Sequence, residues 1–306
     1  MEAKHIARWN GFKWSALAGS SGFWNTGIRT LGVFDDGQGE ALYAGGSFTE
    51  ISGVEANRIA KWDGQGWSAL NGPLGNGIDQ HAVNDLETFD DGSGPALFVG
   101  GYFQLAGGVE ANRIAKWDGT TWSALIDLGG NGVGEYWVRA LAVFDDGGGP
   151  DLYVGGSFDT AGGVEANNIA RWDGAAWSKV SGPLGFGVSG GGVTSLEVFD
   201  DGNGPVLYVG GFFDTAGGVE ANSIARWDGS TWSAIEGPAG NGTNETVRAI
   251  RGIHDGVGQA IHVGGYLTEA GGLASDRFAI WRCPDNLLFA DGFERGDSSL
   301  WSGVTQ

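Results

Sequence analysis

Pairs of adjacent aspartates recur four times along the chain, and their chemistry is that of hard oxygen ligands. Each pair opens a turn of the form Asp-Asp-Gly-x-Gly, and the members are Asp35 and Asp36, Asp90 and Asp91, Asp145 and Asp146, and Asp200 and Asp201. Carboxylates in a glycine-rich loop could coordinate calcium, and Asp151 adds a carboxylate beside one pair. The turns lack the alternating acidic positions of an EF-hand loop. We therefore expect structural hairpin turns, with calcium as the alternative and no other cofactor.

The sequence contains no familiar catalytic motif. The single cysteine, Cys283, excludes an internal disulfide and a cysteine-rich metal site. The four histidines occupy unrelated positions, and no nucleophile elbow, phosphate loop or zinc-helix motif occurs. Glycoside hydrolysis needs two carboxylates around one bond, and the only candidates are Glu87 and Glu197, with Asp85 beside them.

These residues stand on a repeat of about 55 residues, which is most complete over residues 138–180. One aromatic position recurs at intervals of 55, at Phe34, Phe89, Phe144 and Phe199, and Ile253 follows at 54. A period of this size indicates a unit that buries its apolar face only against its neighbours. Near-identical copies argue against an asymmetric catalytic site, so we expect the protein not to be an enzyme.

Within one copy the pattern is that of short strands. Alternating residues run from Val138 to Phe144, and the run ends in the turn Asp145-Asp146-Gly147. A second strand is expected at 152–154, before a Gly-Gly pair, a third at 168–172 and a fourth at 177–180, the last two joined by an Asp-Gly turn. The 60 glycines penalise helices throughout. Repeated four-stranded antiparallel units predict an all-β protein of the β-propeller type.

The copies resemble the kelch-type propeller blade, in which a strand ending in Gly-Gly is followed by an aromatic-Asp turn and a tryptophan-bearing strand. The pairs here are Gly45-Gly46, Gly100-Gly101, Gly155-Gly156, Gly210-Gly211 and Gly264-Gly265. The turn reads Trp-Asp-Gly rather than the usual Tyr-Asp-Pro. The segment GGVEANxIAxWDG is also similar to the bacterial delta-type propeller repeat. This resemblance implies a fold and says little about activity.

The copies define the expected domain organisation. A β-propeller is predicted over 1–290, with a half blade at 4–18 and blades at about 27–70, 82–125, 137–180, 192–235 and 246–290. Five first strands favour five blades, and six with one incomplete blade is the alternative. If the N-terminal pair of strands completes the ring, Trp9 and Trp14 should be buried like their counterparts Trp62 and Trp67.

The C-terminal tail, 291–306, departs from the repeat. Together with the preceding residues it resembles a short Phe-x-Asp-Gly-Phe-Glu-x-Gly-Asp ending found on many exported bacterial proteins, which implies a bacterial, extracellular or cell-envelope location. The few residues before the first copy do not predict a signal peptide. Because the chain begins in the middle of a copy, we expect it to be incomplete at its N-terminus.

Charge narrows the range of partners. The net charge of −20 should repel nucleic acids and anionic membrane surfaces. No apolar run reaches the length of a membrane span, so membrane insertion is not expected. A protein or a glycan is the expected partner.

Two further features recur in four copies. Val-Glu-Ala-Asn supplies Glu55, Glu110, Glu165 and Glu220 with Asn57, Asn112, Asn167 and Asn222. We expect this pair to bond the backbone of the neighbouring blade, and a repeated ligand site is the alternative. The paired tryptophans of each copy, such as Trp172 and Trp177, are expected to pack between blades.

The connections between blades differ from copy to copy, and a binding face is expected where a constant frame carries variable loops. The candidate ligand-binding residues are Trp24, His81, Tyr136, Trp137 and Asn244. The favoured function is a non-enzymatic extracellular module for protein interaction or structure. A lectin-like glycan binder that uses Trp24, Tyr136 and Trp137 is the alternative, and a glycoside hydrolase based on Glu87 and Glu197 is a third.

Overall fold

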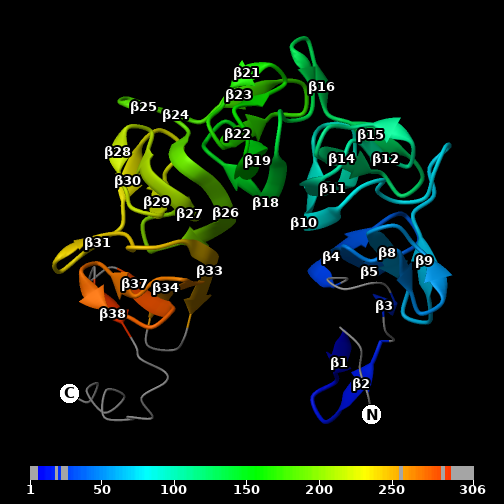
Figure 1. Cartoon of the computed structure of the whole chain (residues 1–306), viewed down its shortest axis with the longest axis horizontal. Coiled ribbons are helices and arrows are strands. Elements are labelled where there is room, and N and C mark those ends of the chain that lie inside the picture. Colours follow the sequence, from blue (N-terminus) through cyan, green and yellow to red (C-terminus); the bar gives the residue numbers. More distant parts are fainter. Residues whose placement is uncertain (1–5, 18–19, 22–26, 255–257, 284–286, 291–306) are drawn as a thin grey trace. The chain divides into compact units, whose positions relative to one another are not determined.

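The computed structural model describes residues 6–17, 20–21, 27–254, 258–283 and 287–290, and its regular elements are strands (Figure 1). Within these ranges there is no helix, and hence none that could span a membrane. The chain divides into two compact units, Met1–Val180 and Ser181–Gln306. Each unit is described by itself.

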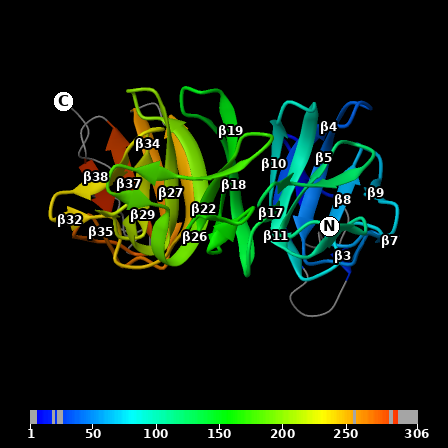
Figure 2. The same ribbon diagram turned by 90° about the horizontal axis from the view of Figure 1, so that it is seen from above.

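The N-terminal unit contains three four-stranded antiparallel sheets, each from one copy of the repeat. The first sheet is β4 (Ile28–Asp35), β5 (Glu40–Gly46), β8 (Ile59–Trp62) and β9 (Trp67–Ala69); the second is β10 (Ala82–Asp90), β11 (Pro95–Tyr102), β14 (Ile114–Trp117) and β15 (Trp122–Ala124); the third is β18 (Trp137–Asp145), β19 (Pro150–Ser157), β22 (Ile169–Trp172) and β23 (Trp177–Lys179). Figure 2 shows β4, β5 and β8 side by side.

Short two-stranded hairpins lie in the segments that connect the strands of these sheets. Between the second and third strands lie β6 (Glu50–Ile51) and β7 (Val54–Glu55), β12 (Leu105–Ala106) and β13 (Val109–Glu110), and β20 (Thr160–Ala161) and β21 (Val164–Glu165). The connection after the second sheet forms β16 (Ile126–Asp127) and β17 (Gly130–Asn131). At the N-terminus β1 (Ala7–Trp9) pairs with β2 (Trp14–Ala16), and β3 (Ser20–Ser21) pairs with β6.

The C-terminal unit contains two main sheets, one of five strands and one of four. The fourth sheet is β26 (Val188–Asp200), β27 (Pro205–Ala216), β29 (Ile224–Trp227) and β30 (Trp232–Ala234), with β28 (Val219–Glu220) paired to β27; the fifth is β33 (Val247–His254), β34 (Gln259–Gly265), β37 (Phe278–Cys283) and β38 (Leu287–Ala290). The hairpins are β24 (Ser181–Gly182) with β25 (Gly185–Phe186), β31 (Glu236–Gly237) with β32 (Gly240–Asn241), and β35 (Glu269–Ala270) with β36 (Leu273–Ala274).

Neighbouring sheets approach each other closely where the second strand carries its Gly-Gly pair. A Cβ on Gly100 of the second sheet would lie 2.5 Å from Val138 Cγ1 of the third, and a Cβ on Gly45 would lie equally close to Val83. Only glycine, which has no Cβ, leaves room for the valine of the next sheet, and this explains why the first residue of the pair is glycine. The second member is equally confined, because a Cβ on Gly101 would lie 2.2 Å from the carbonyl oxygen of Ala82.

Apolar side chains fill the layers between sheets. One buried cluster joins the second and third sheets and includes Phe89, Phe98, Val138 and Leu152. The tryptophan pairs are part of this packing: Trp172 and Trp177 are buried with ring centroids 5.2 Å apart. The expectation that the recurring tryptophans pack between sheets is confirmed for these rings, and Trp117, Trp122, Trp227 and Trp232 are buried in the same way.

Each first strand contains a β-bulge at the equivalent position of its copy. The register shifts between Val83 and Asp85 in the second sheet and between Val138 and Ala140 in the third, and all five first strands share this shift. A bulge re-aims one side chain out of the pleat. The re-aimed residues are Arg29, Asn84, Arg139, Thr194 and Arg248.

The all-β architecture of repeated four-stranded antiparallel sheets, of the propeller-blade type, is therefore confirmed. The fifth sheet takes its fourth strand from 287–290, where the sequence predicted a replacement for the tryptophan strand. The number of blades and the closure of a ring stay predictions, as do the domain boundaries. The C-terminal tail lies outside the described residues.

The burial of Trp9 and Trp14 that completion of the ring would give is not seen, because these side chains are 49% and 64% exposed. Their rings contact each other, with centroids 5.4 Å apart. The N-terminal hairpin instead uses Ile6 and Leu17, which join the buried cluster of the first sheet. Trp67 Nε1 donates a hydrogen bond of 2.7 Å to the carbonyl oxygen of Leu17.

We predict that removal of residues 1–17 destabilises the N-terminal unit, because it exposes the apolar face that Ile6 and Leu17 cover. Two such side chains stabilise by about 3–6 kcal/mol, so the melting temperature should fall by on the order of 10 °C. The control is the double variant Trp9→Ser, Trp14→Ser, which changes exposed rings and should melt close to the full chain. A truncated chain that melts within a degree or two of the full chain would contradict the prediction.

Candidate functional site

The first aspartate of each Asp-Asp-Gly turn caps the turn. Oδ1 of Asp145 accepts hydrogen bonds from the backbone N–H groups of Gly147 and Gly149 at 2.8 and 3.0 Å. Oδ1 of Asp35, Asp90 and Asp200 accepts the equivalent pair of bonds. This carboxylate holds the positive-φ glycines of the hairpin, as aspartates in turns commonly do.

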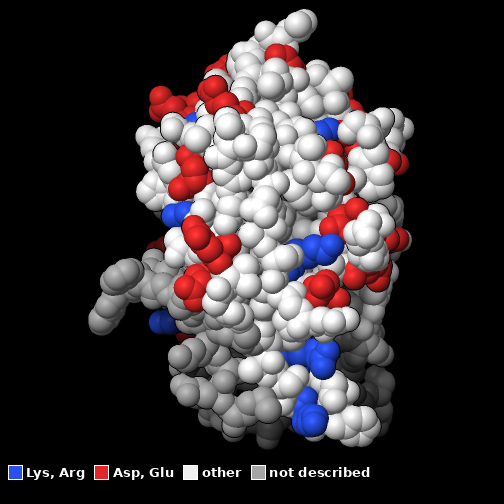
Figure 3. All heavy atoms as spheres, turned by 90° about the vertical axis from the view of Figure 1, so that its right-hand side faces the viewer, with Lys and Arg blue, Asp and Glu red and all other residues white. Residues whose placement is uncertain are grey.

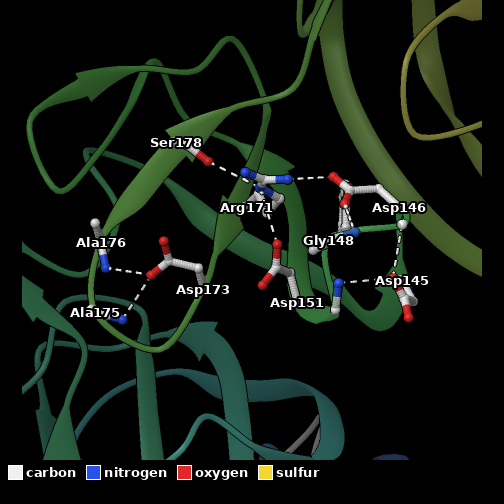
Figure 4. Close-up of polar contacts among 12 residues, drawn as sticks. Asp145, Asp146, Gly148, Asp151, Arg171, Asp173, Ala175, Ala176 and Ser178 are labelled. Atoms are coloured by element: carbon white, nitrogen blue, oxygen red, sulfur yellow. Dashed lines mark hydrogen bonds and ion pairs between the residues drawn. The ribbon is translucent and has the colours of Figure 1, made fainter.

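The second aspartate forms an ion pair with a cation on the third strand of the same sheet. Asp146 pairs with Arg171, whose Nε also lies 3.2 Å from Asp151 Oδ2 (Figure 4). Asp201 pairs with Arg226 at 3.1 Å, and it accepts a hydrogen bond from the hydroxyl of Tyr208. Asp36 pairs with Lys61 in the same arrangement, with the hydroxyl of Tyr43 at 3.0 Å.

The second copy shows how this group tolerates change. Phe98 replaces the tyrosine there, and Ser93 supplies a hydroxyl in its place: Ser93 Oγ donates to the other carboxylate oxygen, Asp91 Oδ1, at 2.6 Å. Lys116 Nζ donates to the same hydroxyl at 2.8 Å and pairs with Asp91. The exchange keeps the carboxylate, the cation and a hydroxyl together.

The environment fixes the charge of these aspartates. Burial alone would raise the pKa of Asp36. The hydrogen bonds from Lys61 and Tyr43 lower it by more, so the pKa lies below its ordinary value. The pKa of Asp91 is lowered in the same way, against burial, by Lys116 and Ser93. In the described part of the chain, no group of three or more histidine, cysteine, aspartate or glutamate residues is placed to hold a metal ion. These eight aspartates have structural partners, and calcium binding stays a hypothesis.

The Val-Glu-Ala-Asn element holds a connection rather than a neighbouring sheet. Asn57 Nδ2 donates to the carbonyl oxygen of Asn76 at 3.1 Å, and Asn76 Nδ2 donates to that of Glu55 at 2.8 Å. Asn76 lies in the connection that leads from the first sheet to the second. The prediction that this element bonds the neighbouring blade is therefore wrong, because its partner is the connection. The glutamate side chains of the element are exposed, at Glu55, Glu110, Glu165 and Glu220.

Two carboxylates on first strands, Asp85 and Glu197, join adjacent sheets. Asp85 Oδ1 accepts from Thr30 Oγ1 of the first sheet at 3.2 Å, and its Oδ2 accepts from the backbone N–H of Leu141 of the third at 2.8 Å. Glu197 Oε1 likewise accepts from the N–H of Gly252 at 3.0 Å, and Arg251 pairs with Oε2 at 3.2 Å. These carboxylates serve as clamps between sheets.

Glu87 differs from them, because its only hydrogen bond in the described structure comes from the N–H of Thr88 beside it. Burial, with the charge of Asp85 as a smaller contribution, raises the pKa of Glu87 to about 7. A carboxyl group with this pKa could exchange a proton near neutral pH. Asp85, whose charge contributes to this shift, is not a free partner for Glu87, because its carboxylate is committed to the neighbouring sheets.

Three of the predicted ligand residues gather at one place in the N-terminal unit. His81 stacks on Tyr102, with centroids 4.3 Å apart and the planes at 29°. Tyr102 meets the Trp137 ring edge to face at 5.9 Å, and Tyr136 lies 6.3 Å from Trp137. We call His81, Tyr102, Tyr136 and Trp137 the aromatic cluster. The Tyr136 side chain is 55% exposed, and His81 is exposed as well.

Two arginines accompany the aromatic cluster. The bulge of the third sheet places the guanidinium carbon of Arg139 4.6 Å from the centre of the Trp137 ring, a cation–π geometry. Arg113 Nε donates to the carbonyl oxygen of Tyr136 at 3.3 Å. Trp137 Nε1 is buried and has no hydrogen-bond partner among the described residues.

The other two predicted ligand residues lie apart from this cluster in the sequence. Asn244 belongs to the C-terminal unit, where its Oδ1 caps the N–H groups of Thr268 and Glu269 at 3.0 and 2.9 Å. Asn244 also lines a pocket of about 390 Å³ with Phe212 and Glu269. Trp24 lies outside the described residues.

Sequence reasoning missed Tyr102 and Phe212. A signal for them was present, because the residue after each Gly-Gly pair varies while its neighbours do not: it is Ser47, Tyr102, Ser157, Phe212 and Tyr266 in turn. In the second and third sheets this position ends the second strand opposite the start of the first, where Tyr102 pairs with Ala82 and Ser157 with Trp137. In the fourth sheet Phe212 lies within the longer strand β27 and pairs with Gly192. In each sheet, we call the end of the hairpin of first and second strands at which this position lies the rim end.

Charge on the surface is mixed in sign but mainly acidic. On the face that Figure 3 shows, acidic side chains lie on both flanks with a few basic ones between them. The 37 acidic residues exceed the 17 basic ones, and several of the basic side chains are already bound in the ion pairs described above. The remaining surface therefore favours a cationic partner.

The comparisons with known proteins include a distant likeness to a solved structure. No protein-family model matches the sequence, and no curated protein matches it. Among solved structures, the extracellular domain of a putative hybrid two-component system from B. thetaiotaomicron superposes with a TM-score of 0.46 at 13% identity. The alignment covers 88% of this chain and 29% of that chain.

We predict that Glu87 makes stability fall as pH rises from about 4.5 to 7. The folded chain holds the Glu87 proton more tightly than the unfolded chain, since the folded pKa is about 7 and the ordinary value is 4.5. Ionisation above the unfolded pKa therefore costs folding free energy, and the loss is complete above the folded pKa.

The variant Glu87→Gln cannot ionise. Relative to the unmodified chain, its free energy of unfolding should increase by on the order of 1–3 kcal/mol between pH 4 and pH 8. Chemical denaturation at both pH values measures this difference, and Glu165→Gln at an exposed position is the control. The same pH dependence in Glu87→Gln and the unmodified chain would show that Glu87 titrates normally.

Proposed function

We propose that this chain is a non-enzymatic binding module of the bacterial cell exterior, built from kelch-like or delta-type propeller blades, which holds a protein partner at the aromatic cluster. The observation that carries the proposal is the assembly of His81, Tyr102, Tyr136 and Trp137 at one junction of a frame that is otherwise repeated. A uniform scaffold that gathers different side chains at one end is a common design for binding.

The chemistry of the cluster favours a protein. Tryptophan, tyrosine and arginine are the residues that dominate binding energy at protein interfaces. The Trp137 ring is already approached by Arg139, Tyr102 and Tyr136, so its surface is divided among edges and a guanidinium. A sugar would need a free and flat ring face. Stacking of a glycan on Tyr136 and Trp137, with Trp24, is the second candidate.

The commitments of the carboxylates support a module without catalysis. A glycoside hydrolase would use Glu87 and Glu197, and Glu197 is held by Arg251 and Gly252 in a clamp between sheets. The exported character of the protein rests on the resemblance of the C-terminal tail to that of exported bacterial proteins. Hydrolase activity and calcium dependence are not part of the proposal.

The proposal is tested by selection from a displayed library of random peptides, with a glycan array as the parallel arm. Peptides that bind the unmodified chain should bind Trp137→Ala at least tenfold more weakly, because hot-spot residues contribute about 2 kcal/mol or more. The control is Phe12→Ala, an exposed ring on the N-terminal hairpin. Melting curves check that both variants are folded.

The alternative outcomes are distinct. Glycans that bind the unmodified chain but do not bind Trp137→Ala would favour the lectin-like function for this site. Peptides that bind Trp137→Ala and the unmodified chain equally would place the interface elsewhere, and a screen without any ligand would overturn the proposal.

A further inference from the structure

The C-terminal unit has a pocket of about 390 Å³ at the rim end of the fourth sheet. Phe212 forms part of its wall, and 55% of this large ring is exposed. Asp214 follows two residues later on β27, and Glu269 on β35 lines the same pocket. A pocket of this volume has the size of a small-ligand site.

The amide side chains of the pocket are already committed. Asn244 Nδ2 donates to Thr268 Oγ1 at 2.8 Å, while Asn244 Oδ1 accepts two backbone N–H groups. Asn222 Nδ2 donates to Asn241 Oδ1 at 2.5 Å. Asn241 Nδ2 in turn donates to the carbonyl oxygen of Glu220 at 3.2 Å. These groups shape the pocket and hold its walls together.

The carboxylates of the pocket have no such partners. Neither Asp214 nor Glu269 forms an ion pair or a side-chain hydrogen bond with another residue that the structure describes. This differs from the aspartates of the turns, each of which is matched by backbone N–H groups or by a cation. The pocket therefore offers carboxylate acceptors and an aromatic face, while its amide donors are engaged.

The repeat shows that this combination is specific to one junction. In the second copy the counterparts of Phe212 and Asp214 are Tyr102 and Gln104. In the third copy they are Ser157 and Asp159, which keeps the carboxylate and loses the ring. The counterparts of Glu269 in the second, third and fourth copies are Leu105, Thr160 and Thr215. An acidic residue occurs there again only in the first copy, as Glu50.

We propose that this pocket binds the side chain of an arginine or lysine presented by a protein partner, with Asp214 and Glu269 as its acceptors and Phe212 against its cationic face. A guanidinium or ammonium group carries donors and no acceptor, which matches a site with available acceptors. Such cations also stack on aromatic faces. A neutral sugar needs donors as well as acceptors from the protein. The net charge of −20 draws cationic partners to the whole chain.

The site is separate in sequence from the aromatic cluster, and it extends the proposed protein-binding function by naming the chemistry of a partner. The probe is arginine amide, followed by NMR through the backbone N–H signals of Phe212, Asp214 and Asn244. Citrulline amide, which has the same shape without the charge, and galactose are the matched probes. These signals report on the C-terminal unit and do not depend on Trp137, so failure here and failure of the aromatic cluster are distinguishable.

Arginine amide should shift these signals in a saturable manner, and citrulline amide and galactose should not. The double variant Asp214→Asn, Glu269→Gln should weaken binding at least tenfold, and Phe212→Leu should weaken it less. Asp159→Asn, which alters the counterpart beside Ser157, should bind as the unmodified chain does. Binding should weaken at high salt, because the attraction is electrostatic.

Three results would overturn the proposal. Arginine binding that survives in the double variant would reflect general attraction to an acidic surface. Equal shifts with citrulline amide would remove the role of charge, and saturable shifts with galactose would make the pocket a sugar site. The melting temperature of the double variant, compared with that of Asp159→Asn, checks that the loss of binding is not a loss of fold.

Discussion

The close face-to-face approach of adjacent sheets is the constraint on which the rest of the described structure depends. Three second strands present a glycine where the next sheet presents a valine: Gly45 faces Val83, Gly100 faces Val138 and Gly210 faces Val247. Without that space the layers of buried aromatic and aliphatic side chains could not interdigitate at interior density. The polar clamps depend on the same approach, since the Asp85 carboxylate reaches Thr30 on one side and Leu141 on the other. Packing and hydrogen bonding thus share one geometric condition.

A second recurring device works within each of the first four sheets. The Asp-Asp-Gly turn divides its two carboxylates between tasks: the first caps the hairpin and the second ties it to a cation on the third strand. The replacement of tyrosine by Phe98 and Ser93 in the second copy keeps the charges and a hydroxyl together. This suggests that the group is maintained for the order of the turn, which in turn fixes the ends of the two inner strands.

The sequence was sufficient for features that repeat. The strands, the turns of Asp145 and its counterparts, and the buried tryptophan pairs follow from spacing, because each copy supplies the same local chemistry. The partner of Asn57 could not be predicted, since the spacing does not say which connection folds back onto the hairpin. Trp9 and Trp14 were expected to be buried like Trp62 and Trp67 if the N-terminal strands complete the ring, but the hairpin packs through Ile6 and Leu17.

The candidate sites were predictable only in part, because they arise where copies differ. His81, Tyr136 and Trp137 were identified as variable residues of the connections, but Tyr102, which stands between them, comes from a different strand. Phe212 and Glu269 were missed for the same reason: their neighbours in space come from two copies. The candidate binding residues therefore lie at rim-end positions where the copies differ, and the positions that all copies share hold the sheets together.

The central claim is that the glycine at the sheet-to-sheet contact is required by its neighbour, and one comparison tests it directly. Gly100→Ala should lower the free energy of unfolding in urea by at least about 2 kcal/mol, because the new methyl group would meet Val138 at 2.5 Å. Gly66→Ala, at a position with no atom within 4 Å of the new Cβ, should change it by less than about 0.5 kcal/mol or stabilise the chain slightly. Equal effects of the two substitutions would contradict the account.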